Sequence, residues 1–397
     1  MKDSAIIRIN VSCRHRPEQF VANRSNRPPP HKAPHRHAAA HAQKPKARAH
    51  TIDDVAARAG VSIKTVSRVV NREPNVREAT AKRVLQAIHE LNYRPNFSAR
   101  NLASPRAYLI AVLYDNPSDN YIVSILEGVL SACEEARYGV LLRPCDVSSP
   151  RLIDRVHEMV TQRRASGLVL TPPLCDQVAL LRTLDADHVD YVSIAPYDEN
   201  RGKPFVSVDD RRASRDLTEY LLSRGHRRIG FIKGHPLHGA ASRRLLGYQD
   251  AHREHGIEID ERLIANGLFS FQSGVECGRR LLHLPEPPTA IFASNDDMAA
   301  GVLHAAHEMG LEVPAQLSVA GYDDTPIARY VYPSLTTIRQ PIRAMAQGAV
   351  ECLIRSIRQR SGFVPEGPIT QRFDYELVIR HSVAPLSPTT AAAETTA

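Results

Sequence analysis

The sequence predicts an all-α helix-turn-helix headpiece joined to a bilobal α/β domain with two doubly wound parallel sheets. Three short helical segments lie close together in residues 51–91, around a glycine turn. From residue 108 onward, strand-like and helical segments alternate, which is typical of parallel sheets covered by helices. Residues 1–50 carry a net charge of +9, residues 51–106 carry +5 and the remainder carries −6. A basic front on an acidic body predicts a polyanion partner at one end only.

The first 49 residues are rich in Pro, Ala, His and Arg and have no apolar periodicity, which predicts disorder. We interpret their irregularly spaced histidines as solvated residues rather than as a metal-binding tail. Two explanations of this extension stay open: added nonspecific attraction to DNA, or a start codon assigned too far upstream. Residues 383–397, rich in Pro, Thr and Ala, are expected to be a second disordered tail without a heptad pattern.

The first helix of the headpiece is expected to begin after Thr51, which forms a capping box with Asp54. Gly60 ends this helix and starts a tight turn, and Ser62 can cap the second helix. Apolar periodicity predicts that Val66, Val69 and Val70 of the second helix point inward, together with Val84, Leu85, Ile88 and Leu91 of the third. A small second helix with a polar outer face is the shape that enters a major groove.

The body is expected to contain strands and helices in alternation. Strand-like runs occupy residues 108–114, 167–170, 191–195, 228–233, 290–294 and 317–323. Helical patterns lie near residues 121–137, 151–164, 211–224, 241–255, 273–283, 296–309 and 341–360. We expect a first lobe of residues 107–205 plus 339–368, and a second lobe of residues 206–338 plus 369–382.

The strings DVAARAGVS-x-x-TVSRVVN, ELNYRPN and LA agree with a known headpiece over about fifty residues. The chain resembles the LacI/GalR family of bacterial transcriptional regulators. The competing interpretation is a three-helix packing unit with a chance basic face. The resemblance implies a headpiece at residues 50–95, a hinge helix and linker at 96–106, and a body similar to periplasmic sugar-binding proteins. It also implies a homodimer that binds a pseudopalindromic operator on double-stranded DNA.

The resemblance assigns DNA-binding roles to residues of the second helix and the hinge. Ile63, Lys64 and Arg68 would reach base edges, by a thymine methyl contact or by hydrogen bonds to guanine, and the alternative is a solvated basic face. Thr65, Ser67 and Asn71 would hold phosphates. Asn96 would cap the hinge helix, Leu102 would wedge into the minor groove unless it packs on its own domain, and small Ala103 would follow it.

The effector, a sugar or sugar derivative, is expected at the carboxyl ends of the strands, between the lobes. The candidates are Asn120, Tyr121, Arg244, Phe269, Asn295, Asp296 and Asp323. Arginine and carboxylates suit vicinal hydroxyls, and an aromatic face suits a sugar ring. Alternatives stay open: Asn295 or Asp296 could cap a helix, and Tyr121 and Phe269 could be core residues. Ile122 departs from an aromatic pair found in some relatives, which weakens a purine-corepressor interpretation.

Other functional classes find little support. No GxxxxGK[ST], GxGxxG, GxSxG or HExxH string occurs, so we expect no enzyme and no cofactor beyond the small-molecule effector. His252 and His255 suggest no third metal ligand, and the six cysteines form no CxxC pair, which suits a reducing cytoplasm. A solute-binding protein and a sugar-metabolising enzyme are the alternatives. We expect a repressor released by its ligand, although a corepressor would need the same parts.

Overall fold

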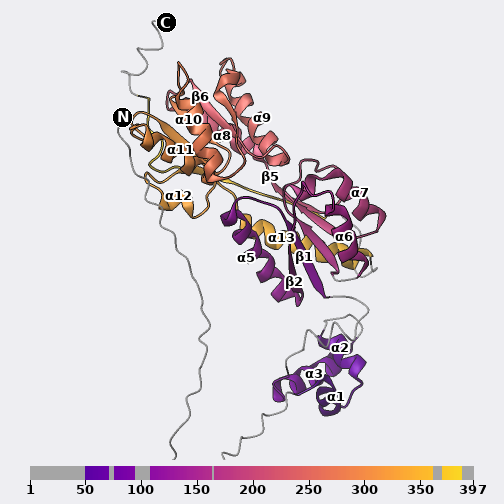
Figure 1. Ribbon diagram of the computed structural model, residues 1–397. Coiled ribbons are helices and arrows are strands. Elements are labelled where there is room, and N and C mark those ends of the chain that lie inside the picture. The colour runs from indigo at the N-terminus through magenta and orange to yellow at the C-terminus, as the bar shows by residue number, and fades with distance from the viewer. Residues whose placement is uncertain (1–49, 71–75, 94–107, 163–164, 361–368, 387–397) are drawn as a thin grey trace, which may run out of the picture. The chain divides into compact units, whose positions relative to one another are not determined.

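The structure is a computed structural model that describes residues 50–70, 76–93, 108–162, 165–360 and 369–386. The chain divides into two compact units, Met1–Arg94 and Pro95–Ala397. Figure 1 shows the first unit as a small helical headpiece and the second as a two-lobed α/β body. The predicted fold class is confirmed.

Three helices form the headpiece: α1 (Ile52–Ala59), α2 (Ile63–Val70) and α3 (Glu78–Glu90). The predicted capping box is present, because the Thr51 side chain accepts from the Asp54 N–H while the Thr51 N–H donates to the Asp54 carboxylate. Gly60 ends α1 with a positive φ of 65°, a conformation that favours glycine. The core consists of small apolar residues: Val55, Ala56, Ala59, Val66, Val69, Val84 and Ala87.

One position in the predicted apolar stripe of α3 is wrong. Leu85 is 55% exposed, whereas Val84 and Ala87 are buried. Ile88 and Leu91 pack against the same core as Val84. The reason is helical phase: each residue advances about 100°, so positions 84, 87, 88 and 91 share a face and position 85 leaves it.

The first lobe contains a sheet of strand order β11-β5-β4-β3-β1-β2, in which every pairing is parallel. Its strands are β1 (Leu109–Tyr114), β2 (Gly139–Pro144), β3 (Gly167–Leu170), β4 (Tyr191–Ile194), β5 (Phe205–Val208) and β11 (Thr370–Phe373). Its helices are α5 (Asp119–Ala136), α6 (Leu152–Thr161), the 3-10 turn η1 (Leu174–Asp176), α7 (Val178–Ala186) and α13 (Ile342–Arg360).

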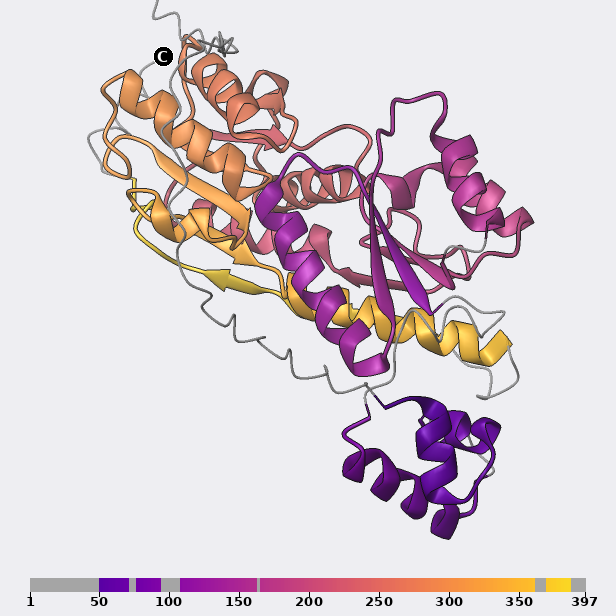
Figure 2. The same ribbon diagram turned by 60° about the horizontal axis from the view of Figure 1, so that its bottom comes forward.

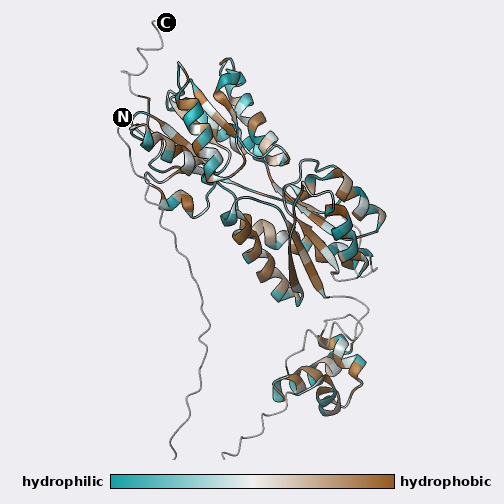
Figure 3. Ribbon diagram, in the orientation of Figure 1, coloured by the Kyte–Doolittle hydropathy of each residue, from teal (hydrophilic) through white to brown (hydrophobic). Residues whose placement is uncertain are grey.

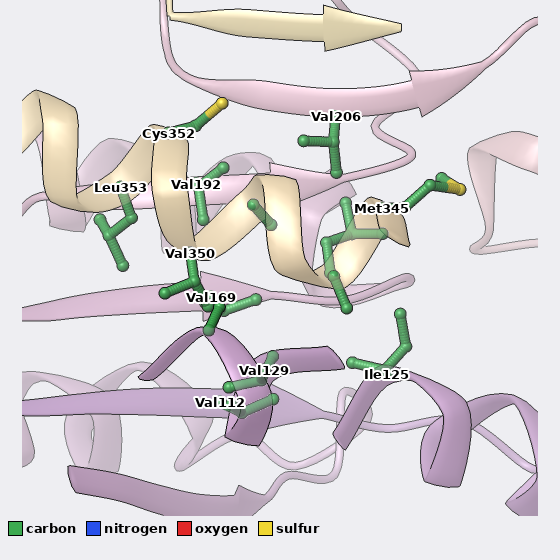
Figure 4. Packing of buried hydrophobic residues seen from close by; sticks show 14 of the residues in the cluster. Val112, Ile125, Val129, Val169, Val192, Val206, Met345, Val350, Cys352 and Leu353 are labelled. Carbon is green, nitrogen blue, oxygen red and sulfur yellow. The ribbon is translucent and has the colours of Figure 1, made fainter. Parts of the chain in front are cut away.

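Helices cover both faces of this first sheet. Side chains of α5 and α13 form one core with the sheet, and side chains of α6 and α7 form another on the opposite face. Figure 4 shows Val350 and Leu353 of α13 pointing toward the strand residues Val169 and Val192. Figure 2 shows α13 running beside α5. Gly128 permits this approach, since a Cβ there would lie 2.3 Å from a backbone oxygen of α13.

The second lobe has a sheet of order β12-β10-β9-β8-β6-β7, parallel except for antiparallel β12. Its strands are β6 (Ile229–Lys233), β7 (Ile264–Asn266), β8 (Ala290–Ala293), β9 (Ser318–Asp323), β10 (Thr336–Arg339) and β12 (Glu376–Val378). Its helices are α8 (Asp210–Ser223), α9 (Gly239–Glu254), the 3-10 turn η2 (Glu261–Leu263), α10 (Phe271–Leu282), α11 (Asp296–Glu308) and short α12 (Ile327–Tyr330). Figure 3 shows apolar central strands beneath helices with hydrophilic outer faces.

Within the described residues, the chain passes between the lobes three times: after β5, after β10 and after β11. The expected lobe boundaries at 205/206 and 368/369 therefore fall a few residues too early. Strands β5 and β11 pair in parallel inside the first sheet, so the crossings occur near Asp209 and Asp374. This pairing was not predicted, because β11 is short and polar and so lacks the apolar pattern by which strands are recognised.

Candidate DNA-binding and effector sites

Helix α2 separates an apolar inner face from a polar outer face. Val66 and Val69 are buried in the headpiece core. Ser62 caps the helix, because its hydroxyl accepts from the Thr65 N–H at 3.2 Å. Lys64 and Arg68 are exposed, and Ile63 is 47% exposed although it is apolar. The outer face thus offers two cations and one aliphatic side chain, which suit guanine edges and a thymine methyl.

The remaining predicted DNA contacts divide into two groups. Thr65 and Ser67 are half-buried at the edges of the outer face of α2, where short hydroxyl side chains can reach phosphates. The other predicted contacts are Asn71, Asn96, Leu102 and Ala103, and all four lie outside the described residues.

The predicted effector residue Arg244 is the centre of a buried ionic cluster in the second lobe. Its Nε donates to Asp210 at 2.9 Å, and its guanidinium also lies 3.6 Å from Asp323. A further N–H donates to the Ser294 carbonyl oxygen, and the Tyr322 ring stacks 3.6 Å from the guanidinium carbon. A buried guanidinium is stable only when carboxylates and acceptors surround it, so these groups fix its position.

Asp323 links this cluster to a lobe crossing. The side-chain amide of Gln340, directly after β10, donates to its carboxylate at 2.7 Å. Burial raises the pKa of Asp323 to about 7, and the positive charge of Arg244 and the Gln340 hydrogen bond oppose that rise. Asp323 also has a φ of 108°, a conformation that ordinary side chains rarely adopt. Such strain is found where the surrounding structure holds a residue in place for function.

The two predicted aromatic residues are both buried. Tyr121 lies in the first turn of α5, where burial raises its pKa and the Asp323 charge adds to the rise, which places the phenol near the cluster. Phe269 packs over Gly234, where a Cβ would come within 1.9 Å of the ring. The ring also contacts His238, at 5.1 Å between centroids. These contacts favour the alternative interpretation, in which Phe269 is a core residue.

Asn295 and Asp296 are engaged within the second lobe. The Asn295 side chain caps α11 by accepting from the Met298 N–H at 3.0 Å, so the capping alternative applies to it. One carboxylate oxygen of Asp296 accepts from the Thr337 hydroxyl and the other from the Thr325 backbone and hydroxyl. With both oxygens occupied, Asp296 anchors loops and does not supply an open ligand acceptor as the sequence had led us to expect.

The next residue, Asp297, joins the two lobes and was missed by the sequence prediction. Its carboxylate accepts from the Ser118 hydroxyl at 2.5 Å and from the Asn120 amide at 3.5 Å. Predicted Asn120 is therefore at the boundary between the lobes. The only signal for Asp297 in the sequence is the pair of aspartates after Asn295. The pair does not show which of the two carboxylates forms hydrogen bonds with the other lobe.

A second set of contacts joins the lobes at the start of α9. The Gly239 N–H donates to Asp176 at 2.9 Å, and Arg243 forms an ion pair with Glu199 at 3.2 Å. A Cβ at Gly239 would lie 2.3 Å from the Cβ of Tyr197, so the lobes touch closely here. A cavity of about 180 Å³ lies beside α6, and none of the residues of this cluster lines it.

Two further features bear on the class of protein. Across the residues whose positions are given, no set of three or more His, Cys, Asp or Glu side chains is arranged to hold a metal ion. His252 and His255 each direct Nδ1 at a backbone oxygen of their own helix instead of at a shared point. None of the helices in the described ranges combines the length and apolarity that crossing a membrane would require.

Comparison with known families and proteins gives matches at both ends of the chain. Residues 51–96 match the family described as "Bacterial regulatory proteins, lacI family". Residues 218–383 match the "Periplasmic binding protein-like domain". The transcriptional repressor PurR of Photobacterium profundum is 32% identical over 343 residues, which are 85% of this chain and 99% of the relative. The ribose operon repressor of Escherichia coli K12 is 35% identical over 316 residues, covering 78% and 93%.

Solved structures agree with these matches. The lac repressor dimer bound to operator and the anti-inducer ONPF has a TM-score of 0.66 at 30% identity, covering 85% of this chain and 100% of that chain. The complex of the transcriptional regulator CelR with cellobiose has a TM-score of 0.64 at 30% identity, covering 84% and 99%. Both similarities extend over headpiece and body together.

Proposed function

The chain belongs to the LacI family of bacterial regulatory proteins and is a DNA-binding transcriptional regulator, and we propose that it is a cytoplasmic repressor released from its operator by a sugar or sugar derivative. The observation that carries this proposal is the pairing of an exposed α2 face with a body whose two lobes meet through polar side chains. The first feature can read DNA, and the second can respond to a small polar ligand.

At the DNA end, Arg68 and Lys64 donate to guanine or phosphate, and Ile63 contacts a thymine methyl. Their common exposure on one face of a capped helix supports this assignment. Thr65, Ser67 and Asn71 bind phosphates. In the hinge, Asn96 caps a helix that forms on DNA, Leu102 enters the minor groove and Ala103 follows without reading a base. One headpiece covers few base pairs, so two copies bind together.

At the effector end, the ligand lies where the lobes meet and replaces some of their direct contacts. Asn120 and Asp297 offer an amide and a carboxylate from opposite lobes, and Asp323 lies near Tyr121. Such groups bind vicinal hydroxyls in fixed geometry. Relatives named for ribose and cellobiose support the sugar class. Arg244, Phe269, Asn295 and Asp296 then act by holding these groups in place.

The proposed coupling uses the crossing after β10. Gln340 in this crossing donates to Asp323, so a ligand that changes the cluster also changes the crossing. Movement of one lobe against the other then separates the two hinge helices of the dimer and weakens operator binding. Linkage requires the reverse as well: operator DNA must weaken ligand binding by the same factor.

The dimer surface is proposed on the outer face of α5. Val123 and Leu130 are 55% and 51% exposed, and a spacing of seven residues places them on one side of the helix. Phe271 of α10 is 43% exposed, and α5 and α11 meet at their N-termini through Ser118 and Asp297. An apolar surface of this kind can bind itself around a twofold axis.

The experiment is a selection of duplexes from a random library by the purified full chain, followed by anisotropy titrations of the selected operator. Ribose, cellobiose and other sugars are then added in turn. The proposal predicts a specific operator and at least one sugar that weakens its binding ten-fold or more. Operator binding that every sugar leaves unchanged contradicts the switch, and a sugar that tightens binding identifies a corepressor.

A further inference from the structure

The polar cavity beside α6 lies in the first lobe, away from the meeting point of the lobes. It has a volume of about 180 Å³ and is formed by the end of β2, the loop after it and α6. The lining residues are Arg143, Pro144, Cys145, Asp146, Ser149, Leu152, Arg155, Val156 and Met159. Neither the DNA-binding face nor the effector cluster uses any of them.

Two arginines converge on this cavity without a carboxylate partner. Both are exposed, and among the described side chains neither Arg143 nor Arg155 lies within ion-pair distance of an acidic group. Burial raises the pKa of the Cys145 thiol to about 11, and the charges of Arg143 and Arg155 both oppose that rise. Both guanidinium groups therefore lie close enough to Cys145 for their charges to act on it.

The one acidic side chain in the lining already accepts hydrogen bonds from its own loop. The Asp146 carboxylate accepts from the Ser148 N–H at 2.9 Å and from the Ser148 hydroxyl at 2.6 Å, and these bonds lower its pKa. It stays charged and ordered within its own loop. The cavity is thus left with two cationic groups against one engaged anion.

Apart from Arg155, the side chains that α6 contributes to this lining are apolar and buried. Leu152, Val156 and Met159 of α6 are buried members of the core beneath the sheet. A bare inorganic anion would leave these side chains without contacts, whereas a compact apolar group would contact them. Cavities for drug-sized ligands measure about 300–1,000 Å³, so this cavity suits a smaller molecule. A cavity of about 150 Å³ in another protein accommodates benzene.

From this combination we propose that the cavity is a binding site for a small aromatic carboxylate of the size of benzoate. The carboxylate lies between Arg143 and Arg155, where planar guanidinium groups can bind it in a forked arrangement. The ring lies against Val156 and Met159. This site is independent of the proposed sugar effector and gives the first lobe a ligand of a different chemical class.

The test is a titration of the full chain, labelled with ¹³C in its methionine methyl groups, with benzoate, benzamide and inorganic phosphate. The Met159 signal is identified as the one lost in Met159→Leu. Benzoate is expected to shift it saturably while the signals of Met298 and Met345 stay in place. Benzamide, which has the same shape without the charge, is expected to bind at least ten-fold more weakly.

Two variants and a matched control complete the experiment. Arg143→Gln and Arg155→Gln are each expected to weaken benzoate binding ten-fold or more. Arg227→Gln removes the same charge from an exposed position in the second lobe and should leave binding unchanged. No Met159 shift with benzoate overturns the site. A shift with phosphate but not benzoate overturns the ligand class. Equal losses of benzoate affinity in all three variants would show that only the net charge of the protein matters, and would overturn the site.

Discussion

The carboxylate of Asp297 in the second lobe accepts a 2.5 Å hydrogen bond from the hydroxyl of Ser118 in the first. The Asn120 amide donates to the same carboxylate. These contacts hold the lobes together directly, at the N-termini of α11 and α5. A polyhydroxylated ligand at this position would compete with Ser118 for the carboxylate, so ligand binding and lobe contact use one set of atoms.

Removing this carboxylate is expected to loosen the lobes. Asp297→Ala should lower the free energy of unfolding by about 1–2 kcal/mol, because the buried Ser118 hydroxyl and the half-buried Asn120 amide lose their acceptor. It should also weaken effector binding ten-fold or more. Urea denaturation and calorimetric titration measure the two effects. Asp119→Ala removes an exposed carboxylate from the start of α5 and should cost under about 0.5 kcal/mol. Equal effects of the two variants would contradict the bridging role of Asp297.

Truncating Arg244 should be far more costly. Arg244→Met leaves Asp210 and Asp323 as uncompensated buried carboxylates, for which about 3–5 kcal/mol of stability is lost. Arg211→Met breaks an exposed pair with Asp250 and should cost at most about 1 kcal/mol. Urea denaturation midpoints give both losses of stability, provided that the slope of the unfolding free energy against urea concentration is the same in each protein. If Arg244→Met retained full stability and lost only effector binding, Arg244 would be a ligand contact instead of an anchor.

The raised pKa of Asp323 predicts a pH dependence of stability. In the folded state this carboxyl keeps its proton up to a pH of about 7. The unfolded chain releases it near pH 3.9. Between these values the folded state binds more protons, so the free energy of unfolding falls as pH rises, by up to about 1.4 kcal/mol per unit. Above pH 8 or so this contribution is constant.

The variant Asp323→Asn isolates this contribution, because other groups titrate in both proteins. His238 gives the opposite slope: burial, together with the charges of His235 and Arg244, lowers its pKa to about 3. The difference in unfolding free energy between wild type and Asp323→Asn, measured by urea at pH 5, 6, 7 and 8, should therefore favour wild type least at pH 8. A difference that does not change with pH would refute the assignment.

DNA reading by α2 predicts a specific loss on mutation. Arg68→Ala should weaken operator binding by about 1–3 kcal/mol and relax discrimination at one base position. Arg83→Ala removes an exposed arginine from α3 and should have a much smaller effect. Anisotropy titrations against operator and random duplexes separate base reading from phosphate attraction. Equal losses from both variants on both duplexes would indicate electrostatic attraction alone.

The central elements of the fold could be predicted because their chemistry is local. Strands such as β8 are fully buried apolar runs, and the Thr51–Asp54 box and Gly60 mark the ends of α1. The edge strands were not found this way, and neither were β5 and β10, which lie inside the two sheets. Strand β7 has three residues and β11 is largely exposed and polar, so both depend on neighbouring strands for their hydrogen bonds.

The candidate site was predictable in type but not in detail. Arg244, Asp323 and Tyr121 do come together, as their places at strand and helix ends suggested. Nothing in the sequence SNDDMA distinguishes Asp296 from Asp297, since the direction of each side chain is set by the first turn of α11. Only the tertiary contacts distinguish them, because Thr325 and Thr337 donate hydrogen bonds to Asp296 and Ser118 donates one to Asp297.

The proposed dimer surface gives the last prediction. Leu130→Glu places a charge at an apolar position of α5 that is buried only when two copies meet. By twofold symmetry each dimer carries the change twice, and a buried leucine contributes roughly 2 kcal/mol, so dissociation should become at least 100-fold easier. Sedimentation equilibrium measures this directly. Val178→Glu on α7 alters a side chain of similar exposure on the other face of the same sheet and should leave the dimer intact. If Val178→Glu dissociated the dimer and Leu130→Glu did not, the interface would lie on the α6 and α7 side, and the dimer surface proposed on α5 would be wrong.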